Sequence, residues 1–363
     1  MSFERNSTSS VRSLSAWRQR RSWCVAGTAA VGLAVGAAVA PVASAAPADE
    51  VDVEVVHDFD DPRQLAEGVA LDGRGNTYVT LGPPFFTGVG YGAVLKIEPN
   101  GSRSTLAEFP DGPAPAGVAV DAFGHVYFAL PDPFGPPERP NVGVHRVKRG
   151  GGTERIAGTE AMVLPNGLAL DRRGALFVSD SILGEIWRIP LQARLGFSGS
   201  GVGPWLTHDL LTGCGQVGVN GIAFYRGDLV VANSDRGLLL RVPIKPDGRP
   251  GEPAIVAGDE DCDPTDKLFS LDGIAVDRRG DVYGALVMQN RLVMIDQRTG
   301  AVLDLLDESQ GLWNPASVAF GTRGRDRGRL YITNYAVLPP VPPANLGPAV
   351  LAYDAGVPGW PFR

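Results

Sequence analysis

One short phrase recurs along this chain and decides its fold. Its third copy reads Asn166-Gly167-Leu168-Ala169-Leu170-Asp171, with Gly174 and then Phe177 in the apolar run that follows. The general pattern is a small or polar residue, Gly, an apolar residue, Ala, an apolar residue and Asp, with a second Gly three residues later. Six copies, of which the sixth is degenerate, begin 44 to 54 residues apart, at Glu67, Ala116, Asn166, Asn220, Asp272 and Ala316.

A repeat of this length that is rich in short strands is typical of a β-propeller blade. Within each copy the phrase predicts an inner strand, an Asp-x-x-Gly turn and a second strand. We expect third strands at 93–97, 143–147, 185–189, 238–242, 291–295 and 349–353. We expect fourth strands at 103–109, 153–156, 204–208, 253–256 and 302–306. The sequence therefore predicts an all-β, six-bladed β-propeller.

The two ends of the repeat array complement each other. The sixth copy runs out of chain after its third strand, and a strand-like segment at 51–59 precedes the first copy. We expect this N-terminal strand to complete the last blade and close the ring, because closure removes an exposed sheet edge. A linear array with a free edge is the competing interpretation.

The composition agrees with many short strands and many turns. Of 363 residues, 47 are Gly and 30 are Pro, about one residue in five, whereas the pair usually makes up roughly 12%. Gly and Pro at this frequency interrupt helices, which argues against long helices. A hydrophobic content of 44% argues against a disordered chain. We therefore interpret residues 46–363 as a single propeller domain.

Residues 1–45 are interpreted as a signal peptide. Five Arg and one Glu in residues 1–21 precede an apolar run at 23–40 and the small residues Ala43-Ser44-Ala45. The pair Arg20-Arg21 is compatible with twin-arginine export; the general export route and a retained membrane anchor are the alternatives. Outside this leader we find no run of about 18 apolar residues. We thus predict a secreted protein whose mature form has no membrane span.

Charge and cysteine content narrow the partners. Once the leader is removed, 28 basic and 39 acidic residues remain, a net charge of −11. This charge argues against nucleic acid and anionic membranes as partners. We separately expect a small-molecule substrate and a monomeric protein. Cys24 leaves with the leader, and the remaining Cys214 and Cys262 predict one disulfide in an exported chain. Two free buried thiols are the alternative.

The first residue of each phrase starts an inner strand, so these six residues should ring the propeller axis. Four of them carry oxygen donors: Glu67, Asn166, Asn220 and Asp272. Carboxylate and amide oxygens are hard ligands that suit Ca²⁺, with Mg²⁺ or another divalent metal as an option. The alternative is a solvated polar channel without metal, in which the two carboxylates tend to share a proton.

With these residues in place, the chain resembles the senescence-marker-protein/gluconolactonase/luciferin-regenerating-enzyme-like family of six-bladed propellers. Diisopropyl fluorophosphatase and the paraoxonases, of the calcium-dependent phosphotriesterase superfamily, are more distant relatives. The resemblance implies a divalent metal held by Glu in the first blade, Asn in the third and fourth, and Asp in the fifth. The matching residues are Glu67, Asn166, Asn220 and Asp272. Two neighbours depart from the sugar-lactonase branch: Gly167 replaces its usual Asp, and Leu164 its usual Arg.

The resemblance implies a secreted Ca²⁺-dependent hydrolase of a lactone or related ester. Asp272 is the expected catalytic residue, activating water or attacking the substrate, and both Asn amides would also donate hydrogen bonds to an oxyanion. Asp180 and Asn233, at the ends of second strands, are candidates for contact with the substrate or the ligands, or else they cap turns. The alternative functions are a non-catalytic, metal-pinned binding or scaffold propeller and a phosphotriesterase-like hydrolase.

Overall fold

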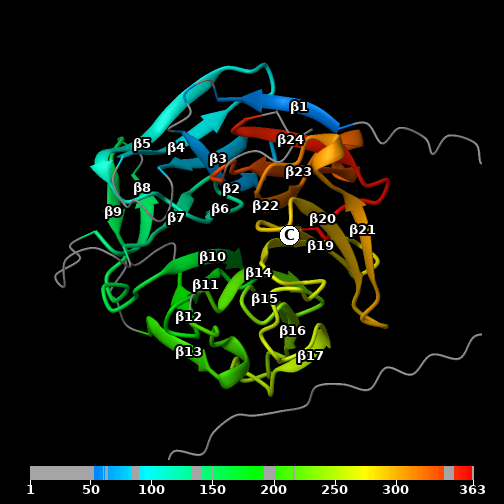
Figure 1. Cartoon of the computed structure of the whole chain (residues 1–363). Helices are drawn as coiled ribbons and strands as arrows, with labels where there is room; N and C mark the ends of the chain where they lie inside the picture. Colours follow the sequence, from blue (N-terminus) through cyan, green and yellow to red (C-terminus); the bar gives the residue numbers. More distant parts are fainter. Residues whose placement is uncertain are drawn as a thin grey trace, which may run out of the picture. The chain divides into compact units, whose positions relative to one another are not determined.

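The computed structural model describes residues 53–59, 61, 64–83, 90–132, 141–148, 150–191, 201–215, 217–338 and 347–361. They form six four-stranded antiparallel sheets arranged as the blades of a β-propeller, which confirms the predicted fold class (Figure 1). The helices of the described residues are three short 3-10 turns, η1 (Asp209–Leu211), η2 (Glu308–Gln310) and η3 (Gly324–Gly328). In this part of the chain, no helix has the length and apolarity to cross a membrane. The predicted signal peptide lies outside the described residues, and the boundary at residue 45 stays a prediction.

Each blade uses four strands, counted outward from the axis. Blade 1 holds β2 (Leu65–Leu71), β3 (Thr77–Gly82), β4 (Gly90–Ile97) and β5 (Arg103–Gly112). Blade 2 holds β6 (Val118–Val120), β7 (Val126–Leu130), β8 (Gly143–Val147) and β9 (Thr153–Arg155). Blade 3 holds β10 (Pro165–Leu170), β11 (Ala175–Asp180), β12 (Glu185–Pro190) and β13 (Gly203–Thr207).

The second half of the ring repeats the plan. Blade 4 holds β14 (Val219–Tyr225), β15 (Asp228–Asn233), β16 (Leu238–Val242) and β17 (Ala254–Ala257). Blade 5 holds β18 (Leu271–Val276), β19 (Asp281–Leu286), β20 (Arg291–Asp296) and β21 (Val302–Leu306). Blade 6 holds β22 (Pro315–Phe320), β23 (Arg329–Asn334), β24 (Ala349–Asp354) and, as its outermost strand, β1 (Val53–Asp58).

The ring closes through this last blade. β1 pairs antiparallel with β24, from Val53 opposite Tyr353 to Asp58 opposite Ala349 (Figure 1). An ion pair of 2.6 Å between Arg329 of β23 and Glu54 of β1 crosses the same junction. The predicted closure by an N-terminal strand is thus confirmed, and the linear array is not what the chain forms.

The core lies between neighbouring blades, because each sheet is covered on both faces. The second strands show this best: every residue of β3, β7 and β11 is buried. Between blades 3 and 4 the ring of Phe177 packs edge-on against Trp205 at 5.0 Å and against Phe224 at 5.3 Å. Burial on both faces explains why the second strands read as nearly continuous apolar runs rather than alternating ones.

A β-bulge recurs at the start of the inner strands. In blade 3, Pro165 pairs with Asp180 and Leu168 with Val178, so Asn166 and Gly167 together oppose the single residue Ser179. The register shifts at the equivalent point of β2, β14, β18 and β22. A bulge redirects the side chain it contains, so it aims the first residue of the phrase.

The glycine of the phrase allows close packing at the axis. A Cβ atom on Gly167 would lie 2.5 Å from the backbone oxygen of Asn220 in the next blade, which no side chain tolerates. Hydroxyl groups join the same strands. Ser179 Oγ accepts from the Gly167 N–H at 2.8 Å and donates to the Asn220 carbonyl at 2.6 Å. Equivalent hydroxyls, at the junctions of blade 1 with blade 2 and of blade 6 with blade 1, belong to Thr80 and Thr333.

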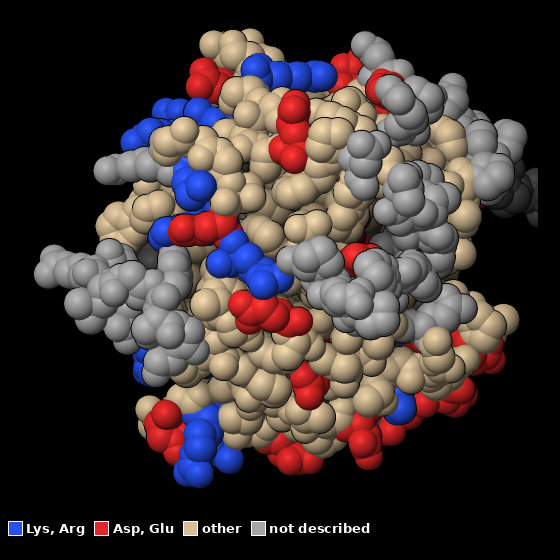
Figure 2. Space-filling model, turned by 90° about the vertical axis from the view of Figure 1, so that its left-hand side faces the viewer, with Lys and Arg blue, Asp and Glu red and all other residues tan. Residues whose placement is uncertain are grey.

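The outer edge on the left of Figure 1 carries acidic and basic side chains close to one another rather than one sign of charge (Figure 2). Ion pairs of blade 2 follow this mixed pattern. Arg146 of β8 donates through Nε to Glu154 of β9 at 2.9 Å, and Arg155 lies 3.6 Å from Glu160. The charges of this edge therefore neutralise each other locally.

Candidate metal centre

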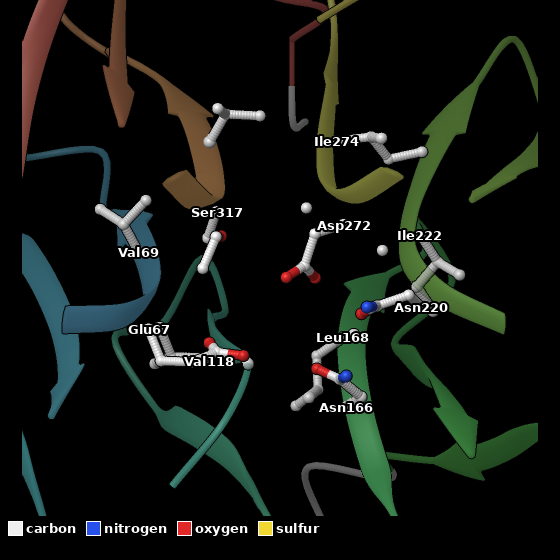
Figure 3. Close-up of a pocket in the computed structure, with 16 residues that line it drawn as sticks. Glu67, Val69, Val118, Asn166, Leu168, Asn220, Ile222, Asp272, Ile274 and Ser317 are labelled. Atoms are coloured by element: carbon white, nitrogen blue, oxygen red, sulfur yellow. The ribbon is translucent and has the colours of Figure 1, made fainter. Parts of the chain in front are cut away.

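The structure brings the four predicted oxygen-donor side chains together. Glu67, Asn166, Asn220 and Asp272 line one cavity of about 80 Å³ among the inner strands β2, β10, β14 and β18. Figure 3 shows their carboxyl and amide groups directed toward a common space, each arriving from a different strand. The convergence predicted from the repeat register is therefore present. In blade 6, Ala316 and Ser317 line the same cavity without adding a carboxyl or amide group.

Aliphatic side chains form the rest of the cavity wall. The residue two positions after the start of the phrase is apolar in every blade, and all six line the cavity: Val69, Val118, Leu168, Ile222, Ile274 and Val318. The oxygen donors thus form a single polar layer against an apolar surround (Figure 3). Such surroundings solvate charge poorly, so the ionised form of a carboxyl group is disfavoured there.

The pKa values of both carboxyl groups in the cavity are raised. Burial raises the pKa of Glu67 to about 7. Burial also raises the pKa of Asp272 well above its usual range, the negative charge of Glu67 adds to the increase, and the Asn220 side-chain amide opposes it. Within the described residues, neither carboxyl group forms an ion pair with Lys, Arg or His. The site therefore holds two acids that disfavour each other's ionisation, and a cation between them would relieve this.

The two amides are held to different degrees. Asn220 Nδ2 donates to Ser234 Oγ at 2.9 Å, and Ser234 Oγ donates to the carbonyl of Leu271 at 2.8 Å. Asn166 Nδ2 lies farther from its serine, 3.4 Å from Ser181 Oγ. We expected both amides to donate to an oxyanion, but one N–H of Asn220 Nδ2 is given to Ser234, and the Asn220 side chain also forms a hydrogen bond with the Asp272 carboxyl group. What this amide has left for a ligand is chiefly its oxygen.

Asp180 and Asn233 lie outside the cavity wall and are fully buried. Asp180 accepts hydrogen bonds from the backbone N–H groups of Val163 at 2.7 Å and Leu183 at 3.1 Å, among others. Asn233 Nδ2 donates at 2.9 Å to the carbonyls of Leu210 and Thr212. These are the local contacts of the turn-capping alternative, and they use the polar atoms that substrate contact would need.

The predicted disulfide between Cys214 and Cys262 is present, with a Cα–Cα distance of 6.2 Å. Cys214 precedes β14 and Cys262 precedes β18, the strands that carry Asn220 and Asp272. The bond therefore joins the two segments that lead into neighbouring candidate ligands. The backbone N–H of Cys214 also donates to Asp235 at 2.9 Å, which fixes one end of this connection.

The donor set fits a hard cation. Within the described parts of the chain, no cluster of three or more His, Cys, Asp or Glu side chains gathers as a metal site. The candidate centre instead pairs two carboxylates with two amide oxygens. Ca²⁺ accepts six to eight oxygen ligands of this mixed kind, so about two to four positions would be left for water or substrate. The absence of sulfur and imidazole donors from the set disfavours softer metals.

Fold and site together define a class: six-bladed propellers with a ring of oxygen donors at the axis. Residues 211–336, about a third of the chain, match the model of the SMP-30/Gluconolactonase/LRE-like region. The resemblance drawn from the sequence is thereby confirmed. The matched stretch includes Asn220 and Asp272 and ends before the chain closes its ring. The search of curated proteins found no match.

Solved structures with the same fold include a luciferin-regenerating enzyme, 15% identical with a TM-score of 0.60, covering 85% of this chain and 97% of its own. Regucalcin from Agrobacterium tumefaciens strain C58, described as a calcium-binding protein, is 14% identical with a TM-score of 0.58, covering 85% and 95%. A structural-genomics target described as a candidate gluconolactonase is 17% identical with a TM-score of 0.58, covering 87% and 96%. At these identities the likeness is one of fold.

Proposed function

We propose that this chain is an exported, Ca²⁺-dependent hydrolase of a lactone or related ester. The observation that carries the proposal is the meeting of two carboxyl and two amide groups in one cavity, with no basic side chain of the described residues to balance the acids. A divalent cation supplies the missing charge. The family region and the calcium-binding neighbour support the same interpretation.

Glu67, Asp272 and the side-chain oxygens of Asn166 and Asn220 would hold the ion. When bound, a divalent cation at this place polarises the carbonyl oxygen of an ester. Asp272 would accept a proton from the attacking water, or attack the ester itself, and burial together with the charge of Glu67 raises its pKa well above the usual range. The six aliphatic side chains that line the same cavity would lower the polarity around the reacting groups.

Export is the second part of the proposal. The sequence of residues 1–45 supports it, and so does the Cys214–Cys262 disulfide, because such bonds persist mainly in oxidising compartments. We further propose that the mature chain acts as a monomer on a small molecule.

A substrate panel tests the catalytic claim. Purified residues 46–363 would be assayed on lactones, aryl esters and an aryl phosphotriester, with calcium and with a chelator. We expect turnover of a lactone or ester that the chelator and Asp272→Asn both abolish. Asp304→Asn, on the outer strand β21 with its side chain about half exposed, is the matched control and should keep full activity. Absence of metal-dependent turnover on every substrate would overturn the hydrolase.

The departures at Gly167 and Leu164 favour one alternative, a propeller that uses the metal as a structural pin and is not catalytic. Leu164 is buried, with 2% of its surface exposed, so a substrate has no access to that position. Calcium binding without turnover in the panel would favour this alternative. Turnover of the phosphotriester alone would favour the phosphotriesterase-like one.

A further inference from the structure

A serine follows the second strand in only two blades, and they are the two whose phrase begins with Asn. By pairing register, the equivalent residues from blade 1 to blade 6 are Gly82, which ends β3, then Pro131, Ser181, Ser234, Val287 and Tyr335. Ser181 and Ser234 are both buried, with 1% and 7% of their surface exposed. Each lies beside the side-chain amide of its own blade, Ser181 beside Asn166 and Ser234 beside Asn220.

The hydrogen bonds of Ser234 determine which way the Asn220 amide points. A serine hydroxyl has one proton to donate, and the carbonyl of Leu271, at 2.8 Å from Oγ, can only accept. With its proton given to Leu271, Ser234 can only accept from Asn220, so the group that faces it at 2.9 Å is the amide nitrogen. The opposite orientation would set an oxygen lone pair against an oxygen lone pair, or leave the Leu271 carbonyl without a donor.

We propose that Ser234 is a positioning residue that holds the Asn220 amide with Oδ1 toward the channel, where a divalent cation would bind. This inference rests on the metal site of the proposed function. Leu271 directly precedes Asp272, so the same hydroxyl also joins the strand of one candidate ligand to the strand of the next. Ser234 itself does not line the cavity and touches no substrate.

Ser181 provides an internal comparison. Its Oγ lies 3.4 Å from Asn166 Nδ2, at the limit of a hydrogen bond, against 2.9 Å in the other pair. The Asn166 amide is thus held less firmly. Removing the Ser181 hydroxyl should therefore disturb the cation site less than removing that of Ser234.

The test is a double-mutant cycle read by calorimetric Ca²⁺ titration of the mature chain. Ser234→Ala should weaken Ca²⁺ binding about tenfold, equivalent to about 1.4 kcal/mol, because the amide is then free to flip. In the Asn220→Asp background the same change should cost less than twofold, because a carboxylate presents two equivalent oxygens. Ser234→Thr should restore affinity, and Ser181→Ala should cost less than Ser234→Ala. If Ser234→Ala does not fold, Ser234→Cys replaces it, since a thiol is a weak donor and acceptor.

A merely structural role gives a different pattern. The effect of Ser234→Ala on Ca²⁺ affinity would then be absent, or equal in both backgrounds, and either of these two outcomes overturns the inference. A wild-type chain that binds neither Ca²⁺ nor Mg²⁺ overturns it as well. The hydrolase can fail separately: a chain that shows the expected cycle but hydrolyses nothing keeps the positioning role and loses the catalytic one.

Discussion

Aspartate occurs at both ends of the repeated inner strand, and its surroundings shift its pKa in opposite directions at the two ends. At its start in blade 5, Asp272 faces the channel, and its pKa is raised by burial and by the charge of Glu67. At its end in blade 1, Asp72 occupies the turn after β2. Burial would raise the pKa of Asp72 too, but hydrogen bonds from Asn76, Arg74 and Tyr78 lower it overall.

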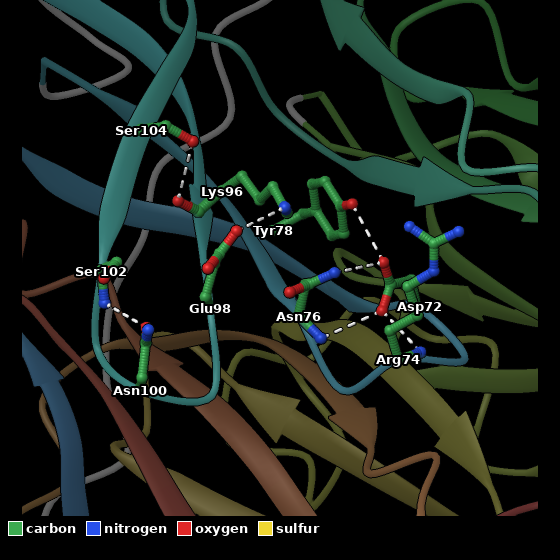
Figure 4. A network of polar contacts seen from close by, with 9 residues as sticks. All are labelled: Asp72, Arg74, Asn76, Tyr78, Lys96, Glu98, Asn100, Ser102 and Ser104. Carbon is green, nitrogen blue, oxygen red and sulfur yellow. Dashed lines mark hydrogen bonds and ion pairs between the residues drawn. The ribbon is translucent and has the colours of Figure 1, made fainter.

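Figure 4 shows how the chain itself satisfies Asp72. Its Oδ1 accepts from the backbone N–H groups of Arg74 at 2.8 Å and Asn76 at 3.0 Å. Its Oδ2 accepts from Asn76 Nδ2 at 2.7 Å and from the Tyr78 hydroxyl at 3.1 Å. The hydrogen-bonding capacity of Asp72 is therefore satisfied within its own turn, whereas Asp272 has no positively charged partner among the described residues. Whether the protein itself satisfies the carboxyl group thus distinguishes an aspartate that stabilises the blade from one that is available to bind a ligand.

The largest effect on Ca²⁺ affinity is expected from substitution of the two carboxyl groups in the cavity. Asp272→Asn and Glu67→Gln should each weaken Ca²⁺ binding more than 100-fold, about 3 kcal/mol or more. Each removes one member of a repelling acid pair, so the metal-free melting temperature should stay equal or rise. Calorimetric titration and thermal unfolding after chelator treatment measure the two. A metal-free protein made clearly less stable by Asp272→Asn would show that this carboxyl is structural.

The reverse pattern is expected at the turn end. Asp72→Ala removes four hydrogen bonds to a partly buried carboxylate and should destabilise the fold by about 1–3 kcal/mol. Ca²⁺ affinity of the folded protein should remain within a factor of two. Urea unfolding and calcium titration of the same preparation check both. Strong loss of calcium affinity without loss of stability would erase the distinction between the two ends.

Glycine substitutions sharpen the comparison with a smaller effect. Gly167→Ala places a methyl group 2.5 Å from the Asn220 carbonyl oxygen, and we expect a cost of about 1–3 kcal/mol. Gly73→Ala, in the turn after β2, meets nothing within 4 Å and should change stability by less than about 0.5 kcal/mol. Chemical unfolding of both variants measures the change in the free energy of unfolding. Equal effects would mean that the inner strands can move apart at the axis.

The last expected effect is a pH dependence of the metal-free protein. The folded-state pKa of Glu67, about 7, lies above its ordinary value of 4.5, so the folded state binds more protons than the unfolded state between these values. Stability from this group is therefore fully present below pH 4.5 and is lost as pH rises through 7. The melting temperature should fall over this interval more in wild type than in Glu67→Gln. An identical fall in both would assign the effect to other groups.

Much of this architecture could be predicted from sequence because the repeat carries it locally. The Asp-x-x-Gly turns and the short apolar runs beside them mark each hairpin, and the third strands β8 and β16 have the predicted bounds. Register then places the phrase's first residues at the axis, so the meeting of Glu67 with Asp272 follows from closure alone. Closure in turn follows from one missing strand at one end and one spare strand at the other.

The structural features that hold the site residues in place could not be predicted from the sequence, for a physical reason. The bulge that aims Asn166 and the hydroxyl bridges of Ser179 and Thr333 depend on pairing register and on contacts between blades, which no single repeat contains. Asp180 illustrates the same limit, since its position suggested contact with the substrate and its buried hydrogen bonds cap a turn. A reading across the copies, rather than along one, would have singled out the serine after the second strand, Ser234.

The central claim is that the four channel residues bind a divalent cation. Its most direct test is calorimetric titration of Ca²⁺ into chelator-treated residues 46–363, with the melting temperature followed in parallel. We expect one site per chain, lost in Asp272→Asn, and a melting temperature that rises with bound Ca²⁺. A folded protein that shows neither binding heat nor a change in melting temperature with Ca²⁺ or Mg²⁺ would contradict it.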